Sequence, residues 1–397
     1  MFSHLAASPD DPILALNEAF MRDARAHKVN LSIGMYFDAT GALPVPDAVR
    51  EAERRLAARA GAKPYLPIEG QPDFSQAVRA LLFGLGHEAV AAGRIATLQT
   101  VGSCGALRVG AELLRQAFPG SAVWVSDPTW ENHRAIFHSA GMAVHAYPYF
   151  DHGTGRLRFE ALCKAIGALP AHSVVLLHAC GHNPTGADMT RAEWTQLAAL
   201  MARRALIPFV DLAYQGFCEG LDADAAPVRL LADAGLGLLV ANSFSKNMGV
   251  YGERCGALSV VCPDAAQATL VLGQLKAIVR QNYSSPPMHA GRLVTEVLND
   301  AALREAWARE VEGMRLRTNA MRAALHEVLR QRLPGYDADY LLRQRGMFSF
   351  TGLSPAQVDA LRESHAVYLV RSGRMCLSGL NGGNVDRVAD AIARVIG

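Results

Sequence analysis

Short apolar segments alternate with amphipathic helical patterns through the middle two thirds of this 397-residue chain. Continuous apolar strands separated by helices are typical of a parallel sheet whose two faces are both covered. In such sheets, ligands bind at the carboxyl ends of the strands. The chain is therefore predicted to have an α/β fold. Its predicted buried strands are residues 95–100, 122–126, 174–177, 208–211 and 238–242, and a helix that starts with a Thr190–Glu193 capping box is predicted over residues 190–204.

The last part of the chain has a different pattern. A long helix-prone run over about residues 288–332 precedes short apolar segments at 347–350, 368–370 and 375–377, and a closing helix is predicted from Asn384. This pattern indicates a smaller α+β domain, which the N-terminal stretch up to about Leu43 is predicted to join. The predicted organisation is an arm at residues 1–12, a small domain formed by residues 13–43 and 313–397, and a large domain over residues 44–312.

The composition excludes several classes of protein. There are 39 Lys and Arg residues against 37 Asp and Glu residues, which is too balanced for an electrostatic nucleic-acid binder. The sequence has no basic leader at its start and no run of the roughly 20 apolar residues that a membrane span needs. Its seven cysteines are scattered without the close pairs of a disulfide framework. We therefore expect a soluble protein of the reducing cytoplasm, without nucleic-acid or membrane partners.

One group of potential metal ligands has to be weighed. His178, Cys180 and His182 alternate and would share a face if one extended segment carried all three. A strand that ends in a turn produces the same spacing, and the sequence marks no distant fourth ligand. No metal site is therefore predicted.

Four segments at or just after predicted strand ends carry candidate chemistry. In the first, Gly102-Ser103-Cys104-Gly105 opens a helix, where free N–H groups and the helix dipole can hold a phosphate. An ordinary glycine turn before a helix would look the same, and the segment lacks the G-x-G-x-x-G spacing of a dinucleotide site. In the second, Asp211 ends an apolar strand, where a carboxylate needs a cationic or hydrogen-bonding partner. A buried aspartate that caps a neighbouring turn is the simpler alternative.

The third and fourth segments supply positive charge. Ser243, Ser245, Lys246 and Arg254 fall within twelve residues, and hydroxyls, an amine and a guanidinium together suit a phosphate and a reactive amine. Most lysines are solvated surface charges, so the prediction of a chemical role for Lys246 depends on these neighbours. Arg374 lies between short apolar segments, where it could bind a carboxylate with two hydrogen bonds or form a structural salt bridge.

Together these residues match the needs of pyridoxal 5′-phosphate. That cofactor requires an anchor for its phosphate, a carboxylate that keeps the ring nitrogen protonated, and a lysine for the Schiff base. The first three segments offer all of these groups. Arg374 would then hold the α-carboxylate of an amino acid.

Over nearly its full length, the sequence resembles the class I aminotransferases of the aspartate and aromatic amino acid group. The resemblance rests on motifs that occur in family order: SDPTWENH, HNPTG, DLAYQGF, NSFSKN, YGERCG, RQNYSSPP, GMFSFTGL and SGRMC. It implies a large domain with a mostly parallel seven-stranded sheet that binds pyridoxal phosphate, plus a smaller α+β domain built from both termini. It also implies a homodimer with shared active sites.

The resemblance assigns roles by motif. Lys246 would be the Schiff-base lysine and Asp211 the partner of the pyridine nitrogen, supported by His133. Asn183 and Tyr214 would bind the phenolic oxygen of the cofactor, and Trp130 would stack on its ring. Gly34 and Arg374 would bind the α-carboxylate side of the substrate. The phosphate would be held by Ser103, Cys104, Ser243, Ser245 and Arg254, and by Tyr65 of the partner subunit. Cys104 departs from the Thr or Ser usual in the family, and a thiol is a weaker donor to phosphate.

The resemblance also guides the prediction of substrate. Members that prefer dicarboxylates are more polar at positions that read here as Met35, Phe37, Leu43, Pro64 and Ser285. Apolar groups there would favour a buried aromatic ring by up to about 2–3 kcal/mol. Arg280, which would come from the partner subunit, should still bind a distal carboxylate. We therefore predict ping-pong transfer of the amino group of tyrosine, phenylalanine or aspartate to 2-oxoglutarate.

Three alternatives stay open. A strict aspartate aminotransferase would share every catalytic residue and differ only in the apolar pocket positions. Another reaction of the same cofactor, such as β-elimination or decarboxylation, is chemically possible, although two arginines suit exchange between carboxylated partners. A non-catalytic binding protein on the same scaffold is disfavoured because Lys246, Asp211 and Arg374 are all intact.

Overall fold

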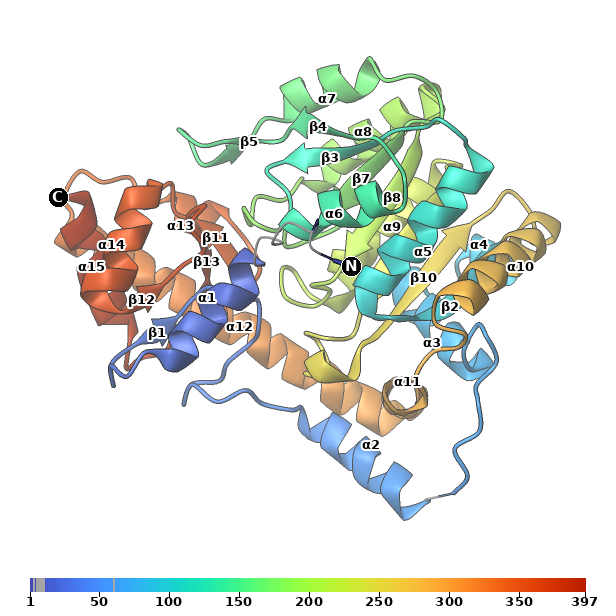
Figure 1. The fold of residues 1–397 in the computed structure, drawn as a ribbon, viewed down its shortest axis with the longest axis horizontal. Helices are drawn as coiled ribbons and strands as arrows, with labels where there is room; N and C mark the ends of the chain where they lie inside the picture. Colours follow the sequence, from blue (N-terminus) through green and yellow to red (C-terminus); the bar gives the residue numbers. More distant parts are fainter. Residues whose placement is uncertain (3, 5–10, 60) are drawn as a thin grey trace.

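A seven-stranded sheet forms the centre of the larger part of the molecule (Figure 1). The computed structural model describes residues 1–2, 4, 11–59 and 61–397, so most of the arm predicted at residues 1–12 lies outside the described residues. The strand order is β2-β10-β9-β8-β7-β3-β4. The strands are β2 (Ile95–Val101), β3 (Val123–Asp127), β4 (Val144–Pro148), β7 (Val174–His178), β8 (Ile207–Leu212), β9 (Leu238–Ser243) and β10 (Cys255–Val261).

The sheet is mostly parallel, as predicted. β4, β3, β7, β8 and β9 run parallel to their neighbours in this series, whereas β10 is antiparallel to both β2 and β9. All five predicted strands are present. The prediction omitted β4 and β10. β10 follows β9 after a loop with one short 3-10 helix. Because no α-helix separates the two strands, the alternation of strands and helices does not predict β10.

Alternate residues of the strands pack against two separate apolar layers. On β8, for example, Val210 and Leu212 belong to one core cluster, whereas Phe209 belongs to the other. We call the cluster of Val210 and Leu212 the first core cluster and that of Phe209 the second. Helices α5 (Gly102–Ala117), α6 (Glu131–Ser139) and α10 (Ala265–Asn282) complete the second core cluster. The first includes residues of α2 (Asp47–Ala58), α3 (Pro72–Phe83), α7 (Phe159–Gly167), α8 (Arg191–Arg203), α9 (Leu221–Asp233) and α11 (Met288–Asn299). Helices on both faces explain why the strands read as continuous apolar runs.

The two ends of the chain meet in the smaller part. β1 (Val29–Asn30) pairs in parallel with β12 (Val367–Tyr368), and β11 (Phe348–Phe350) pairs antiparallel with β13 (Arg374–Cys376). A third core cluster combines Val29 and Leu31 with residues from the last quarter of the chain. The N-terminal segment therefore joins the C-terminal elements, as predicted. The helices of this part are α1 (Pro12–Arg22), α13 (Tyr340–Arg343), α14 (Pro355–His365) and α15 (Val385–Ile396).

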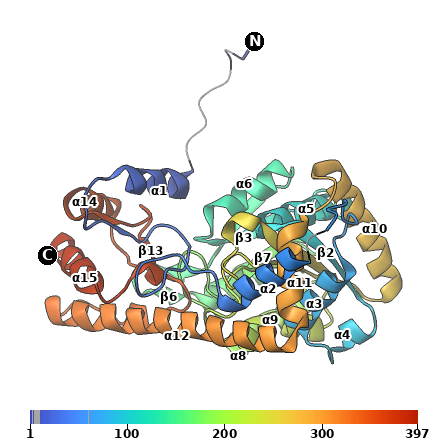
Figure 2. The ribbon, with the colours of Figure 1, turned by 90° about the horizontal axis from the view of Figure 1, so that it is seen from below.

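The helix-prone run over residues 288–332 is two helices, α11 and α12 (Ala301–Arg332). Asp300 separates them, and its side chain caps α12 by accepting a hydrogen bond from the N–H of Leu303 at 2.9 Å. Figure 2 shows α12 running beneath both parts of the molecule. Trp307 near its start belongs to the first core cluster, and Leu325 near its end belongs to the third.

Short elements complete the structure. They are α4 (Glu88–Ala91), the two-stranded hairpin of β5 (Phe150–Asp151) and β6 (Arg156–Leu157), and the 3-10 helices Tyr251–Glu253 and Leu377–Gly379. Within the described residues, no helix combines the length and apolar character that crossing a membrane requires.

Candidate active site

The carboxyl ends of three neighbouring parallel strands bring polar residues together. His178 at the end of β7 is paired in register with Asp211 on β8, and Ser243 ends β9 on the other side. Such an edge is where ligands bind in α/β sheets. A cavity opens there, lined by Ser103, Trp130, His178, Cys180, Asn183, Asp211, Ala213, Tyr214 and Lys246.

Asp211 is held by a buried histidine. Its Oδ2 lies 3.0 Å from Nε2 of His133, whose Nδ1 is 2.8 Å from the hydroxyl of Thr129. Burial opposes ionisation of Asp211, but the hydrogen bond of His133 and the surrounding positive charges, including that of Lys246, together outweigh it and hold the pKa of Asp211 below its usual value. The other oxygen, Oδ1, is buried without a hydrogen-bond partner. A carboxylate oxygen in that state is available to a ligand in the cavity.

Lys246 brings an amine into the same cavity. Its Nζ lies 4.8 Å from the centre of the Tyr214 ring. Burial lowers the pKa of Lys246, and the positive charges of Arg254 and Arg374 act in the same direction, against the opposing effect of Asp211. Burial also raises the pKa of Tyr214, which keeps its phenol protonated. The amine is therefore easier to deprotonate than that of an exposed lysine.

The start of α5 and the loops after β9 form a cradle for an anion. Ser103, Ser243 and Ser245 are all buried, and the N–H groups of the first turn of α5 have no partners within that helix. Nη1 of Arg254 lies 3.4 Å from the hydroxyl of Ser245. Gly102 has a φ of +65°, and a Cβ built on it would lie 2.5 Å from Nη2 of Arg254. Glycine at this position therefore lets the guanidinium approach the start of α5.

Cys104 follows Ser103 in the first turn of α5. Burial raises the pKa of its thiol, so the side chain is neutral. Its Sγ is 3.9 Å from Nδ2 of Asn132. The first turn of α5 therefore offers a neutral thiol beside the anion cradle.

Arg374 on β13 belongs to the smaller part of the molecule and contacts Asn183, which lines the cavity. Arg374 is only 1% exposed, yet its Nη atoms donate hydrogen bonds to neutral acceptors, Asn183 Oδ1 at 2.9 Å and the carbonyl oxygen of Ser32 at 2.6 Å. Its guanidinium lies over the Phe348 ring at 4.7 Å, and its Nε is buried without a partner. Gly34 lies beside this group, since a Cβ there would be 3.0 Å from Phe348. A buried cation with spare donors can bind a carboxylate.

Two predicted site residues are exposed at the surface of the chain. Tyr65 is 94% exposed, and Arg280 lies exposed in the last turn of α10, where it donates to the hydroxyl of Ser284. Neither lines the cavity of Lys246. Of the predicted pocket residues, Met35 and Phe37 are half-buried and Leu43 is 45% exposed. A single chain therefore assembles only part of the predicted site.

The sequence pattern marks His178 only as a possible metal ligand. It lines the cavity, and its ring stacks on that of His182 at 4.3 Å. Burial lowers the pKa of His178 to about 3, so the ring is neutral. Its place at the end of the strand next to that of Asp211 was the signal that could have identified it.

In the described part of the chain, Cys180, Cys218 and Asp224 form the group with the spacing of metal ligands.

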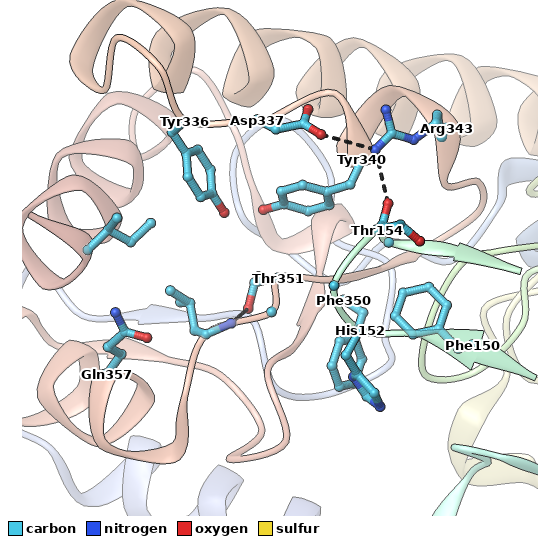
Figure 3. Close-up of a pocket in the computed structure, with 15 residues that line it drawn as sticks. Phe150, His152, Thr154, Tyr336, Asp337, Tyr340, Arg343, Phe350, Thr351 and Gln357 are labelled. Carbon is cyan, nitrogen blue, oxygen red and sulfur yellow. Dashed lines mark hydrogen bonds and ion pairs between the residues drawn. The ribbon is translucent and has the colours of Figure 1, made fainter.

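A second cavity lies where the β5–β6 hairpin meets the C-terminal elements (Figure 3). Phe150 and Phe350 contact each other across it with ring centres 5.6 Å apart. Arg343 joins its two sides, since Nη2 donates to the carbonyl oxygen of Thr154 at 3.3 Å and lies 3.5 Å from Asp337. Its lining contains none of the predicted site residues. This cavity therefore marks a contact between the two parts and not the predicted site.

Comparison with known proteins identifies the family. The family model for aminotransferase class I and II matches residues 26–392. The chain belongs to this family. Tyrosine aminotransferase of Klebsiella pneumoniae is 54% identical, and aspartate aminotransferase of Pseudomonas aeruginosa is 43% identical, each alignment covering 100% of both chains. A crystal structure of an aromatic-amino-acid aminotransferase from Burkholderia pseudomallei, covalently bound to pyridoxal phosphate, has a TM-score of 0.98 and 46% identity, with 100% of both chains covered. The resemblance inferred from the motifs is confirmed at the level of family and fold.

Proposed function

We propose that this aminotransferase uses pyridoxal 5′-phosphate to transfer the amino group of an aromatic amino acid to 2-oxoglutarate, and that it also accepts aspartate. The observation that carries the proposal is one cavity lined by a buried lysine amine and a buried carboxylate with an unpartnered oxygen, next to a buried arginine that donates a hydrogen bond to the lining residue Asn183. The names of the tyrosine and aspartate aminotransferases in the comparison support both substrate classes.

The residues of the cavity fit this cofactor. The unpartnered Oδ1 of Asp211 would face the ring nitrogen, and Trp130 would cover one face of the ring. Asn183 and Tyr214 would bind the phenolic oxygen. The serines and Arg254 of the anion cradle would hold the phosphate, with the first N–H groups of α5. When bound, pyridoxal phosphate supplies an electron sink that stabilises negative charge at the substrate's α carbon.

Lys246 is the group that we propose moves the proton. Its lowered pKa makes the amine easier to deprotonate than that of an exposed lysine, and the neutral amine can accept a proton from the substrate's α carbon at Nζ. Lys246 would then deliver this proton from Nζ to the C4′ carbon of the cofactor. The negative charge of Asp211, supported by His133, would favour a proton on the ring nitrogen of the bound cofactor. The protonated phenol of Tyr214 can donate a hydrogen bond beside the amine.

Arg374 would orient the substrate. Its free Nε and its spare donors are available to the α-carboxylate, and the Phe348 ring and the carbonyl oxygen of Ser32 fix the plane of the guanidinium. A bidentate pair there would present the α carbon to Lys246 and exclude water from the carboxylate.

We further propose a homodimer in which Tyr65 and Arg280 serve the partner's site. Both residues are exposed and neither lines the Lys246 cavity of its own chain, which supports this arrangement. In that arrangement Arg280 would meet the distal carboxylate of aspartate, and Met35, Phe37 and Leu43 would surround an aromatic ring. We propose a small domain formed by residues 13–43 and 313–397 and a large domain over residues 44–312, because a separate core cluster joins Val29 and Leu31 to the C-terminal elements. We also propose a cytoplasmic location, which the scattered cysteines support.

The test is the visible absorption spectrum of the cofactor-loaded protein, recorded before and after addition of phenylalanine without an oxo acid. We expect the band of the bound cofactor to bleach and phenylpyruvate to form. Aspartate should also bleach the band, and Lys246→Ala should abolish multiple turnover with both substrates. Bleaching by aspartate alone would leave a strict aspartate aminotransferase. Undiminished turnover by Lys246→Ala would contradict the proposed mechanism.

A further inference from the structure

Two thiols and a carboxylate lie together beside the active-site cavity. Cys180 follows β7, Cys218 lies in the loop after β8, and Asp224 is in the first turn of α9. One ligand atom from each lies within 4.8 Å of the other two. All three residues are buried. The proposed transamination uses none of them.

Backbone hydrogen bonds to carboxylates fix both loops of this cluster. Asp224 Oδ2 accepts from the N–H groups of Gly216 and Cys218 at 2.8 and 3.1 Å, and its Oδ1 accepts from that of Glu219 at 2.8 Å. On the other side, Asp188 accepts from the N–H groups of Gly181 and His182 at 2.7 and 2.8 Å. The two cysteines are therefore held in place by the loops that carry them.

Glycines make room for the thiol of Cys218. A Cβ on Gly346 would lie 2.9 Å from its Sγ, and a Cβ on Gly181 would lie 3.2 Å from it. Both glycines also have positive φ angles, which side chains disfavour. The backbone therefore packs closely against this sulfur on two sides and fixes its position, and a side chain at either glycine would displace it.

The cluster can be reached from solvent. A groove is lined by Cys180, Cys218, Asp188 and Asp224, and on its rim by Glu219 and Asp222. The Asp222 side chain is 95% exposed. Arginines also line the rim, where Arg229 pairs with Asp222 at 3.1 Å and Arg345 pairs with Glu219. A small cation can enter this groove without passing through the active-site cavity.

We propose that Cys180, Cys218 and Asp224 bind a thiophilic divalent cation of the Zn²⁺ class. Two sulfurs and one carboxylate oxygen are a ligand set that Zn²⁺ accepts, whereas Mg²⁺ and Ca²⁺ require oxygen ligands. Bond lengths to zinc place such ligands about 3.3–3.8 Å apart, so a small closure of the side chains completes the site. Both thiols lose their protons to solvent on binding, and water or Asp188 fills the fourth position.

The experiment titrates the cofactor-loaded protein with Cd²⁺ in the ultraviolet, where cadmium bound to thiolates absorbs. We expect one Cd²⁺ per chain to produce the band and Zn²⁺ to displace it. Cys218→Ser should lose the band and bind Zn²⁺ at least tenfold more weakly by calorimetry. Cys163→Ser is the matched control, because Cys163 lies on α7 outside the cluster, and it should keep the wild-type band.

Three results would overturn the site: no band in the wild type, a band that survives in Cys218→Ser, or a band lost in Cys163→Ser. If Cys218→Ser does not fold, pulsed alkylation of the wild type decides instead. One equivalent of Cd²⁺ should then slow labelling of Cys180 and Cys218 and leave that of Cys163 unchanged. Equal labelling of all three with and without Cd²⁺ would contradict the proposal.

Discussion

Gly102 determines how closely Arg254 can approach the start of α5. We predict that Gly102→Ala weakens binding of pyridoxal phosphate at least tenfold, because the new methyl group would displace the guanidinium from the anion cradle. The positive φ at this position adds a backbone strain of about 1 kcal/mol. Equilibrium binding of the cofactor to the apoprotein, followed by absorbance, measures the effect.

Gly252→Ala is the control for this change. Gly252 is a near neighbour of Arg254 in the sequence, but a Cβ there would have open space around it. Its cofactor affinity should equal that of the wild type. An unchanged affinity in Gly102→Ala would show that the phosphate does not depend on Arg254 at this position.

At the level of single residues, the sequence identified most of the cavity. Ser103, Trp130, Asn183, Asp211, Tyr214 and Lys246 all line it, because each lies in a motif at a strand or helix end. His178 was missed as part of the cavity, since its neighbour Asp211 is 33 residues away in the chain and only the register of β7 and β8 joins them. The Cys180–Cys218 pair was missed for the same reason, because the loops of two strands bring it together.

At the level of elements, α8 starts as its sequence predicts. The hydroxyl of Thr190 accepts from the N–H of Glu193 at 3.3 Å, and the Glu193 carboxylate accepts from the N–H of Thr190 at 2.7 Å. We predict that Thr190→Ala lowers the free energy of unfolding by about 1 kcal/mol. Chemical denaturation at a fixed protein concentration measures this loss.

A second threonine of α8 provides the matched comparison. Thr195 is exposed, and its hydroxyl donates to the carbonyl oxygen of Arg191 within the helix. Thr195→Ala should change the free energy of unfolding by less than about 0.5 kcal/mol. Equal losses in the two variants would mean that the capping box does not stabilise the start of α8.

Elements were predictable where local pattern and tertiary packing agree. Buried parallel strands such as β8 read as apolar runs because helices cover both faces. The break between α11 and α12 was missed because Asp300 is a single polar residue within a helix-prone run, and its capping role depends on local backbone geometry. β10 was missed because a strand that returns antiparallel after a loop carries no helical spacer before it.

At the scale of the whole molecule, the proposed dimer can be tested by mixing variants. One chain carries Lys246→Ala and the other carries Arg280→Leu, and the two are unfolded and reassociated together. If Arg280 serves the partner's site, each hybrid dimer has one site with both native residues. Random pairing would then restore roughly a quarter of the wild-type turnover of aspartate.

Each variant refolded alone is the control and should turn over aspartate poorly. Phenylalanine turnover by Arg280→Leu would show that this chain folds. No recovery in the mixture would mean that Arg280 acts within its own chain, or not at all. The sequence motifs imply this shared site, but one chain cannot display it, since contacts between subunits lie outside the geometry of a single chain.

The unbroken course of α12 has a consequence for how the molecule comes apart. Its 32 residues extend about 48 Å and are anchored in a separate apolar cluster near each end. The crossing at residues 307–325 has no flexible linker, and its peptide bonds are held in helical hydrogen bonds that a protease cannot engage. Limited proteolysis should therefore not release the two parts as separate fragments by cutting there, and their unfolding should be coupled through the bending stiffness of this one rod.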